Sequence, residues 1–143
     1  MSTAKTTVAV TGATGQVGSA TVRCLAQQFP DIRVRAGVRN KQKATMLQNL
    51  GPSVEVVQFD TAIPETLTKA FTGANVACII PPNGPNRIDH TIAMMTAAKK
   101  CEVKHVVMVF GPVDRMPKGS LMLKEVAPAE VSDASISDVL FSL

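Results

Sequence analysis

TVAVTGATGQVGSATVRCLA, residues 7–26, joins an apolar run to a glycine-rich loop and then to a segment with helical periodicity. Its three glycines, Gly12, Gly15 and Gly18, recur at intervals of three. Gly12 permits a tight turn off the strand, Gly15 lets the backbone approach a phosphate closely, and Gly18 lets the helix lie close to the sheet. Because the first N–H groups of a helix and its dipole favour an anion, the stretch predicts a phosphate site.

The donors of this site are expected to be backbone and hydroxyl groups. The N–H groups from Gly15 to Val17 would point at the anion, and Thr11 and Thr14 would add hydroxyl donors. No Lys follows in a GK[ST] arrangement, which argues against a nucleoside triphosphate loop. A glycine-rich turn that only lets the helix pack is the alternative, but the flanking strand and helix favour a dinucleotide site.

Strand-like and helix-like segments alternate along the chain outside this stretch. The pattern predicts strands at 6–10, 32–38, 54–59, 75–80 and 103–110, and helices at 16–28, 42–49, 87–100 and from Pro64 to Gly73. Such alternation is typical of a parallel sheet with right-handed crossovers and helices on both faces. We therefore predict an α/β fold, a doubly wound Rossmann-like sheet of strand order 3-2-1-4-5, with its ligand site at the switch point between strands 1 and 4.

Apolar positions indicate which helix faces pack on the sheet. In the first helix the apolar residues form one stripe of Val17, Ala20 and Cys24, with Val22, Leu25 and Phe29 beside it. In the third helix they are Leu67, Ala70 and Phe71. In the last helix the inward positions are Ile88, Thr91, Ile92, Met95 and Ala98. We expect these residues to face inward.

Length and composition set the class of protein. With 143 residues, 45% hydrophobic and 18% charged, the chain fits one soluble globular domain. The chain has no run of the roughly 20 apolar residues that span a bilayer, and it has no secretory signal. We therefore expect a cytoplasmic protein without membrane contact. Three widely spaced cysteines, Cys24, Cys78 and Cys101, are expected to be reduced and buried, with no metal site.

The positive charge indicates a local anion site. The net charge is +4, and the basic residues cluster only at 33–43. The chain has no Trp or Tyr and five Phe, so it lacks the aromatic platforms on which bases stack. Nucleic acid is therefore not an expected partner.

The end of the second strand bears on which dinucleotide is bound. An NAD site places a carboxylate there to bond the ribose hydroxyls. This chain has Arg39 instead, followed by Lys41 and Lys43, and a guanidinium suits a 2′-phosphate. We predict NADP(H) as the cofactor in preference to NAD(H); a solvated basic helix start is the alternative.

Two further positions border the predicted site. Asp60 directly follows the third strand, and it could bond the adenine amino group or cap the next segment. Pro81 closes the fourth strand, where the backbone would pass the nicotinamide ribose. Since proline has no N–H, any contact there would be apolar or through a carbonyl.

Together these residues resemble the NmrA-like branch of the atypical short-chain dehydrogenase/reductase superfamily. The matching stretches are VAVTGATGQVGSATVRCL, VRAGVRN, VEVVQFD and MMTAAKKCEVKHVVMV, within residues 5–110. The resemblance implies a Rossmann domain that binds NADP(H) through Gly12, Thr14, Gly15, Gln16, Val17, Arg39 and Asp60. It also implies one of two roles, an NAD(P)H-dependent reductase or a regulator that senses the NADP redox ratio.

The departures from this family point away from catalysis. Active short-chain reductases use a Tyr-x-x-x-Lys pair, and this chain has no tyrosine. Phe110 occupies a position where the family often has Ser, and His105 lies at the wrong end of its strand. His90 could approach the cleft from the helix after the fourth strand, but an exposed helix position is preferred. We therefore predict no catalytic residue among those present.

The last part of the chain does not follow the alternating pattern. We expect residues 1–111 to form the NAD(P)-binding domain and residues 112–143 a divergent tail, in which Leu121–Val126 and Ile136–Leu143 could each be a short helix or strand. A truncation, a splice product or ordinary divergence would account equally well for a missing C-terminal substrate lobe. Exposed sheet edges would favour a protein partner or a second copy of the chain.

Three functional hypotheses follow. The first, which we prefer, is a non-catalytic NADP(H)-binding module with a redox-sensing or regulatory role. The second is a reductase of quinones or related carbonyl compounds that works without a Tyr-Lys pair. The third is a fragment of the fold that binds nothing tightly.

Overall fold

The computed structural model of the protein describes residues 5–109 and 139–141. In chain order its elements are β1 (Thr7–Val10), α1 (Gln16–Gln28), β2 (Arg33–Val38), the 3₁₀ helix η1 (Lys41–Ala44), α2 (Thr45–Gln48), β3 (Val54–Gln58), α3 (Pro64–Phe71), β4 (Val76–Ile79), α4 (Arg87–Lys100), β5 (His105–Met108) and β6 (Val139–Phe141).

The strands form one six-stranded sheet in the order β3-β2-β1-β4-β5-β6, and every neighbouring pair is parallel. The predicted fold class and the order 3-2-1-4-5 are confirmed, and β6 is added beyond β5. The chain runs outward from β1 to β3 and then returns to the other side of β1. This reversal makes β1 and β4 the switch point of the sheet.

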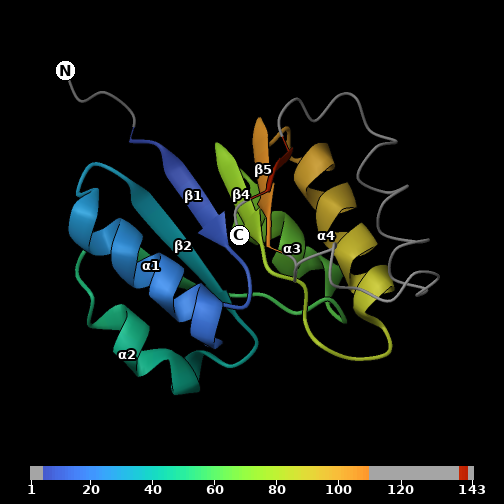
Figure 1. Ribbon diagram of the computed structural model, residues 1–143, viewed down its shortest axis with the longest axis horizontal. Helices are drawn as coiled ribbons and strands as arrows, with labels where there is room; N and C mark the ends of the chain where they lie inside the picture. Colours follow the sequence, from blue (N-terminus) through green and yellow to red (C-terminus); the bar gives the residue numbers. More distant parts are fainter. Residues whose placement is uncertain (1–4, 110–138, 142–143) are drawn as a thin grey trace.

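Helices cover both faces of the sheet, α1 and α2 on one side and α3 and α4 on the other (Figure 1). Successive residues of β1 face opposite sides, so Val8 and Val10 pack in the α1 side and Ala9 in the α3 side. All four residues of β1 are buried, which is the pattern of a central strand in a parallel sheet.

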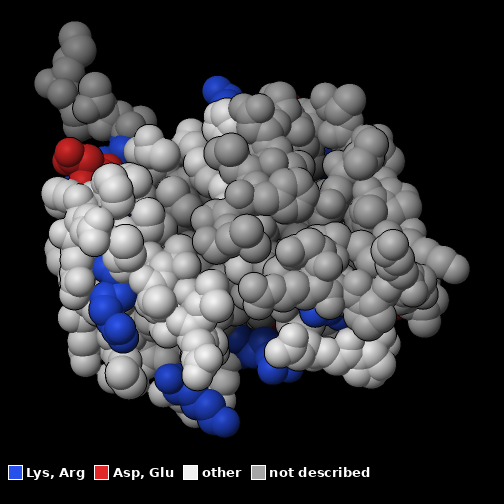
Figure 2. Space-filling view, viewed as in Figure 1, with Lys and Arg blue, Asp and Glu red and all other residues white. Residues whose placement is uncertain are grey.

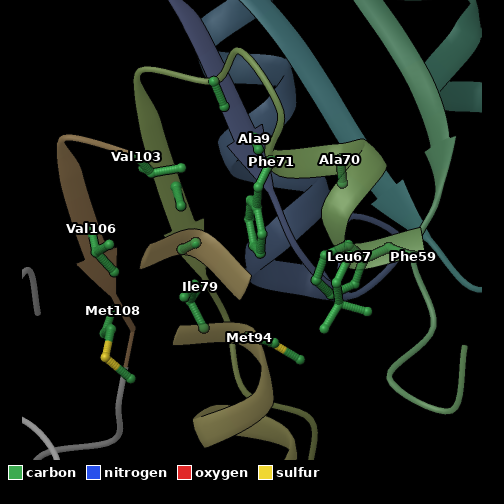
Figure 3. Packing of buried hydrophobic residues seen from close by; sticks show 13 residues of the cluster. Ala9, Phe59, Leu67, Ala70, Phe71, Ile79, Met94, Val103, Val106 and Met108 are labelled. Atoms are coloured by element: carbon green, nitrogen blue, oxygen red, sulfur yellow. The ribbon is translucent and has the colours of Figure 1, made fainter. Parts of the chain in front are cut away.

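The core on the α3 and α4 side is built around two aromatic rings. Phe59 and Phe71 meet edge to face with centroids 5.5 Å apart. Leu67 from α3, Ile79 from β4 and Met94 from α4 complete the same cluster (Figure 3). As predicted for α3, Leu67, Ala70 and Phe71 are buried.

The predicted inner stripe of α1 was wrong. Val17 is 49% exposed, and Ala20 and Cys24 are also exposed. Val22, also predicted to face inward, is buried as expected. Gly18 is buried as well, because α1 contacts the backbone of the glycine loop at Gly18 and this contact sets the rotation of the helix. In a helix where most faces carry small or apolar residues, periodicity alone does not select the buried one.

Other burial predictions were correct only in part. In α4, Thr91 and Ala98 are buried as predicted and Met94 joins them, whereas Ile92 is 47% exposed. Ile88 and Met95 are half-buried, and Phe29 at the end of α1 is 49% exposed.

The three cysteines differ in their environments. Cys78 is buried in β4 as expected, but Cys24 is exposed and Cys101 half-buried. All three are free thiols. Burial raises the pKa of the Cys78 thiol from 9.0 to about 11, so this group is a poor nucleophile at neutral pH.

The second predicted helix, 42–49, consists of the 3₁₀ turn η1 followed by the four-residue α2. Of the predicted tail segments, Leu121–Val126 lies outside the described residues, and Val139–Phe141 within Ile136–Leu143 is a strand. Phe110 also lies outside the described residues.

Candidate functional site

The loop after β1 lies between the carboxyl ends of β2 and β4 and is bonded to both. On one side, the Ala13 N–H donates to the Gly37 carbonyl of β2 at 3.1 Å. On the other, the Thr11 N–H donates to the Cys78 carbonyl of β4 at 3.0 Å. The loop is therefore held over the switch point, where a doubly wound sheet binds its ligand.

The Thr11 hydroxyl forms a second link to β4. Thr11 is buried, and its Oγ1 accepts the Ile80 N–H at 2.8 Å and donates to the Ile80 carbonyl at 3.3 Å. The prediction that this hydroxyl serves the ligand was wrong, since Ile80 occupies it as both donor and acceptor. Thr11 is instead a structural connection between the loop and the segment that leads to Pro81.

Two of the glycines are required by the loop itself. Gly12 has φ +60°, a left-handed conformation that side chains rarely adopt. At Gly18, a Cβ would lie 2.1 Å from the Gly12 carbonyl oxygen and 2.9 Å from the Ala13 Cα. Gly18 thus allows the helix to contact the loop backbone, rather than the sheet as expected.

Gly15 differs from both. Its φ of −74° and ψ of 173° are open to any residue, and a Cβ would approach only the Gly12 carbonyl oxygen, at 3.4 Å. The fold of this chain therefore places little steric demand on Gly15. The open space in front of it fits the prediction that a ligand approaches the backbone there.

The start of α1 has free backbone donors. The Gly15 N–H is bonded to the Gly12 carbonyl at 3.0 Å, so the expectation that it faces the anion was wrong. The Ser19 N–H makes the first helical bond, to the Gly15 carbonyl. The N–H groups of Gln16 and Val17 precede it and have no intrahelical acceptor. No side chain caps this end and no acidic residue lies in the first turn, which keeps it favourable for an anion.

The basic cluster at 33–43 separates into two parts with different roles. Arg35 is half-buried; its Nη1 donates to the carbonyls of Ala70, at 3.1 Å, and Thr72, and its Nε lies 3.5 Å from Glu55 Oε2. These bonds cap the carboxyl end of α3, so Arg35 is structural. Sequence reasoning missed this, because nothing local to β2 shows that a helix ends beside it.

The second part of the basic cluster lies at the carboxyl edge of the sheet. Arg39 follows β2 directly, and Lys41 and Lys43 are in η1; all three are exposed. In the part of the chain that the structure describes, Arg39 makes no hydrogen bond or ion pair. In the view of Figure 2, Lys and Arg side chains gather in the lower half, the direction in which β1 and β2 run in Figure 1.

Asp60 makes hydrogen bonds within the turn that leads into α3. Its Oδ1 accepts the Ala62 N–H at 2.9 Å, and its own N–H donates to Thr66 Oγ1 at 2.9 Å. These bonds turn the chain from β3 into α3. Asp60 remains half-buried and next to the end of β2, since the Phe59 N–H bonds the Val38 carbonyl.

The segment after β4 lies at the same carboxyl edge of the sheet as the glycine loop. Pro81 is buried directly beyond Ile80. Arg87, the first residue of α4, has a buried Nε without a hydrogen-bond partner in the described ranges, and burial lowers its pKa. His90 on α4 is half-buried rather than exposed as expected. His105 begins β5 and therefore lies at the opposite edge of the sheet, as predicted.

The structure thus brings the predicted site residues to one edge. Gly12, Thr14, Gly15, Gln16 and Val17 follow β1, Arg39 follows β2, Asp60 follows β3 and Pro81 follows β4. Within residues 5–109 and 139–141, no group of three or more His, Cys, Asp or Glu side chains could hold a metal ion. No helix in the same ranges is long and apolar enough to cross a membrane.

A doubly wound parallel sheet with a glycine loop at its switch point defines a nucleotide-binding domain of the Rossmann type. The chain belongs to the NAD(P)H-binding family, whose model matches residues 12–137.

Similar proteins include both enzymes and a regulator. An NAD(P)H azoreductase of Xenophilus azovorans is 36% identical over 104 residues, which cover 73% of this chain and 35% of that protein. The Citrobacter triphenylmethane reductase, solved with NADP(H), is 30% identical with a TM-score of 0.75 over 90% of this chain and 44% of that one.

The negative transcriptional regulator NmrA has been solved with NAD and with NADP. It is 26% identical with a TM-score of 0.66, over 76% of this chain and 34% of NmrA. The predicted membership of the NmrA-like NAD(P)-binding group is confirmed. The chain spans about a third of the length of the azoreductase and less than half of the triphenylmethane reductase.

Proposed function

We propose that this domain binds NADP(H) in preference to NAD(H) and acts as a non-catalytic, redox-responsive module. The observation that carries the cofactor preference is Arg39, an exposed guanidinium without a partner in the described chain, at the end of the strand that neighbours the glycine loop. A free guanidinium at this position can pair with the negatively charged 2′-phosphate of NADP(H), whereas the ribose hydroxyls of NAD(H) are neutral and give it no ion-pair partner.

The proposed contacts divide between the two ends of the dinucleotide. Gly12, Gly15 and the N–H groups of Gln16 and Val17 would hold the pyrophosphate, with Thr14 at the rim of the same loop. Arg39 would hold the 2′-phosphate, and the second Asp60 oxygen would bond the adenine amino group. Pro81, which has no N–H, would meet the nicotinamide half through apolar contact or its carbonyl.

The proposed lack of catalysis rests on the missing Tyr-x-x-x-Lys pair, whose tyrosine is the proton donor of active short-chain reductases. The chain has no tyrosine, and His105 lies at the edge of the sheet away from the glycine loop. Cys78 is near the loop, but burial raises its pKa to about 11, so its thiol is a weaker acid than an ordinary cysteine. A module that binds both redox forms without turning them over would report their ratio.

A reductase is the second candidate, and the reductases among the similar proteins favour it. A reactive hydride acceptor such as a quinone needs less help from an acid than a simple carbonyl does. Under this reading, binding and positioning of the cofactor would be sufficient for turnover.

Titration calorimetry with NADPH and NADH tests the cofactor assignment; equal affinities for the two would contradict it. Oxidation of NADPH followed at 340 nm with a panel of quinones and azo dyes separates the two roles. The non-catalytic role predicts the same rate for the wild type as for a variant with a bulky residue at Gly15. A rate clearly above that control would establish the reductase instead.

A further inference from the structure

The backbone on both sides of Arg39 is held by hydrogen bonds. Before it, the Val38 carbonyl accepts the Phe59 N–H at 2.8 Å, which fixes the end of β2 against the segment after β3. After it, Asn40 begins the helical turn η1. Arg39 is thus a single residue between two fixed points, with an exposed side chain.

Asn40 closes the turn with both of its acceptors. Its side-chain Oδ1 accepts the Gln42 N–H at 2.9 Å, and its backbone carbonyl accepts the Lys43 N–H at 3.2 Å. Its φ of −128° and ψ of 108° are extended, as in an ordinary N-cap. The side chain therefore sets the direction in which the chain leaves Arg39.

The rest of this helical segment is anchored elsewhere. Ala44 and Leu47 are buried in the core on the α1 side. Loss of the cap would leave these anchors in place and loosen only the turn that joins Arg39 to Lys43. Lys41 and Lys43, both exposed, lie in that turn.

We propose that Asn40 is a positioning residue for cofactor selectivity: its cap holds Arg39, Lys41 and Lys43 in the arrangement that receives the 2′-phosphate. The inference rests on the proposed function. Asn40 acts through its neighbours, because its carboxamide oxygen is already bonded to the Gln42 N–H. Without the cap, binding of the phosphate would have to order this turn, and part of the binding free energy would be lost.

A graded set of variants tests the proposal. The N-cap preference falls from Asn and Ser through Gly to Ala, so selectivity for NADPH over NADH should fall in the order wild type and Asn40→Ser, then Asn40→Gly, then Asn40→Ala. For Asn40→Ala we expect a loss of about fivefold in NADPH affinity, equivalent to roughly 1 kcal/mol. The NADH affinity should change less than about twofold. Asn49→Ala, an exposed Asn at the end of the same helical segment, is the matched control.

The short probes adenosine 2′,5′-bisphosphate and AMP give the same comparison without the nicotinamide half. A double-mutant cycle with Arg39→Ala should be non-additive, because Asn40 acts on the residue that the second substitution removes. If Asn40→Ser does not restore selectivity, capping is not the cause and the proposal is overturned. An unchanged NADPH preference in Asn40→Ala also overturns it, whereas a wild type without preference contradicts the proposed function itself.

Discussion

The carbonyl oxygen of Gly12 lies 2.1 Å from the point that a Cβ on Gly18 would occupy, whereas a Cβ on Gly15 would lie 3.4 Å from the same oxygen. Two glycines of one motif therefore face the same atom with different consequences. Gly18 is needed for the helix to contact its own loop. At position 15 the fold itself would accept a residue with a side chain, so under the proposed function the bound ligand is the reason for glycine there.

Substitution of Gly18 by Ala should destabilise the protein. The added methyl group would overlap the backbone at Gly12 and Ala13, and backbone cannot move aside as a flexible side chain can. We expect the free energy of unfolding, measured by urea denaturation, to fall by about 1–3 kcal/mol or more. Wild-type stability in Gly18→Ala would show that the loop and helix can separate at no cost.

Gly15→Ala should change binding more than stability. Its backbone conformation is open to alanine, and the nearest atom is an ordinary contact away, so the free energy of unfolding should stay within about 1 kcal/mol of the wild type. The methyl group would occupy the space in front of the helix start, and NADPH affinity should fall at least about tenfold, as measured by calorimetry. Undiminished affinity would mean that no phosphate approaches this backbone.

Arg39→Ala should remove the preference for NADPH over NADH. A hydrogen bond to a charged group contributes about 1.5–3 kcal/mol, which corresponds to a loss of roughly tenfold to a hundredfold in NADPH affinity and little change for NADH. Arg33→Ala is the control, since Arg33 is also exposed but begins β2 at the opposite edge of the sheet. Equal effects of the two substitutions would indicate only a general attraction of positive charge.

Thr11→Val should uncouple the loop from β4. Valine has the shape of threonine but cannot bond the Ile80 N–H and carbonyl, and a buried unsatisfied donor costs about 1–3 kcal/mol. Amide hydrogen exchange at Ile80 should become faster in Thr11→Val and stay slow in Thr11→Ser, which keeps the hydroxyl. Slow exchange in both variants would show that the hydroxyl is not what protects Ile80.

Cys78 predicts a pH dependence of stability at alkaline pH. Its pKa is 9.0 in an ordinary setting and about 11 in the folded protein, because burial disfavours the thiolate. The contribution of the protonated thiol is complete below about pH 9 and is lost as the pH rises towards about 11, at up to about 1.4 kcal/mol per pH unit. Urea denaturation of wild type and Cys78→Ala between pH 8 and 11 should show this slope only in the wild type. Parallel curves would contradict it.

Some parts of the site could be predicted from the sequence because they depend on neighbours in the chain. Gly12 follows a strand and needs a positive φ, and α1 and α4 have the predicted bounds. The strand order also followed from the alternation of elements, since parallel crossovers of one hand leave few arrangements. The proposed NADP(H) preference rests on Arg39, whose position at a strand end is likewise a local property.

Other features depend on partners far away in the chain. Arg35 and Arg39 are four residues apart in one basic cluster, yet Arg35 is bound to the carboxyl end of α3 while Arg39 is free in the described part of the chain. The Thr11 hydroxyl has its partner 69 residues away, at Ile80. The rotation of α1 that exposes Val17 follows from contact between Gly18 and the loop.

The class of fold and the residues that follow each strand at the carboxyl edge of the sheet could be predicted from the sequence alone. Which of those polar groups are bonded within the protein, and which are not, could be seen only in the folded chain. The reason is physical: strands, helices and turns depend on nearby residues, whereas the availability of a hydroxyl, a guanidinium or an N–H depends on whichever distant group folding brings within hydrogen-bond distance.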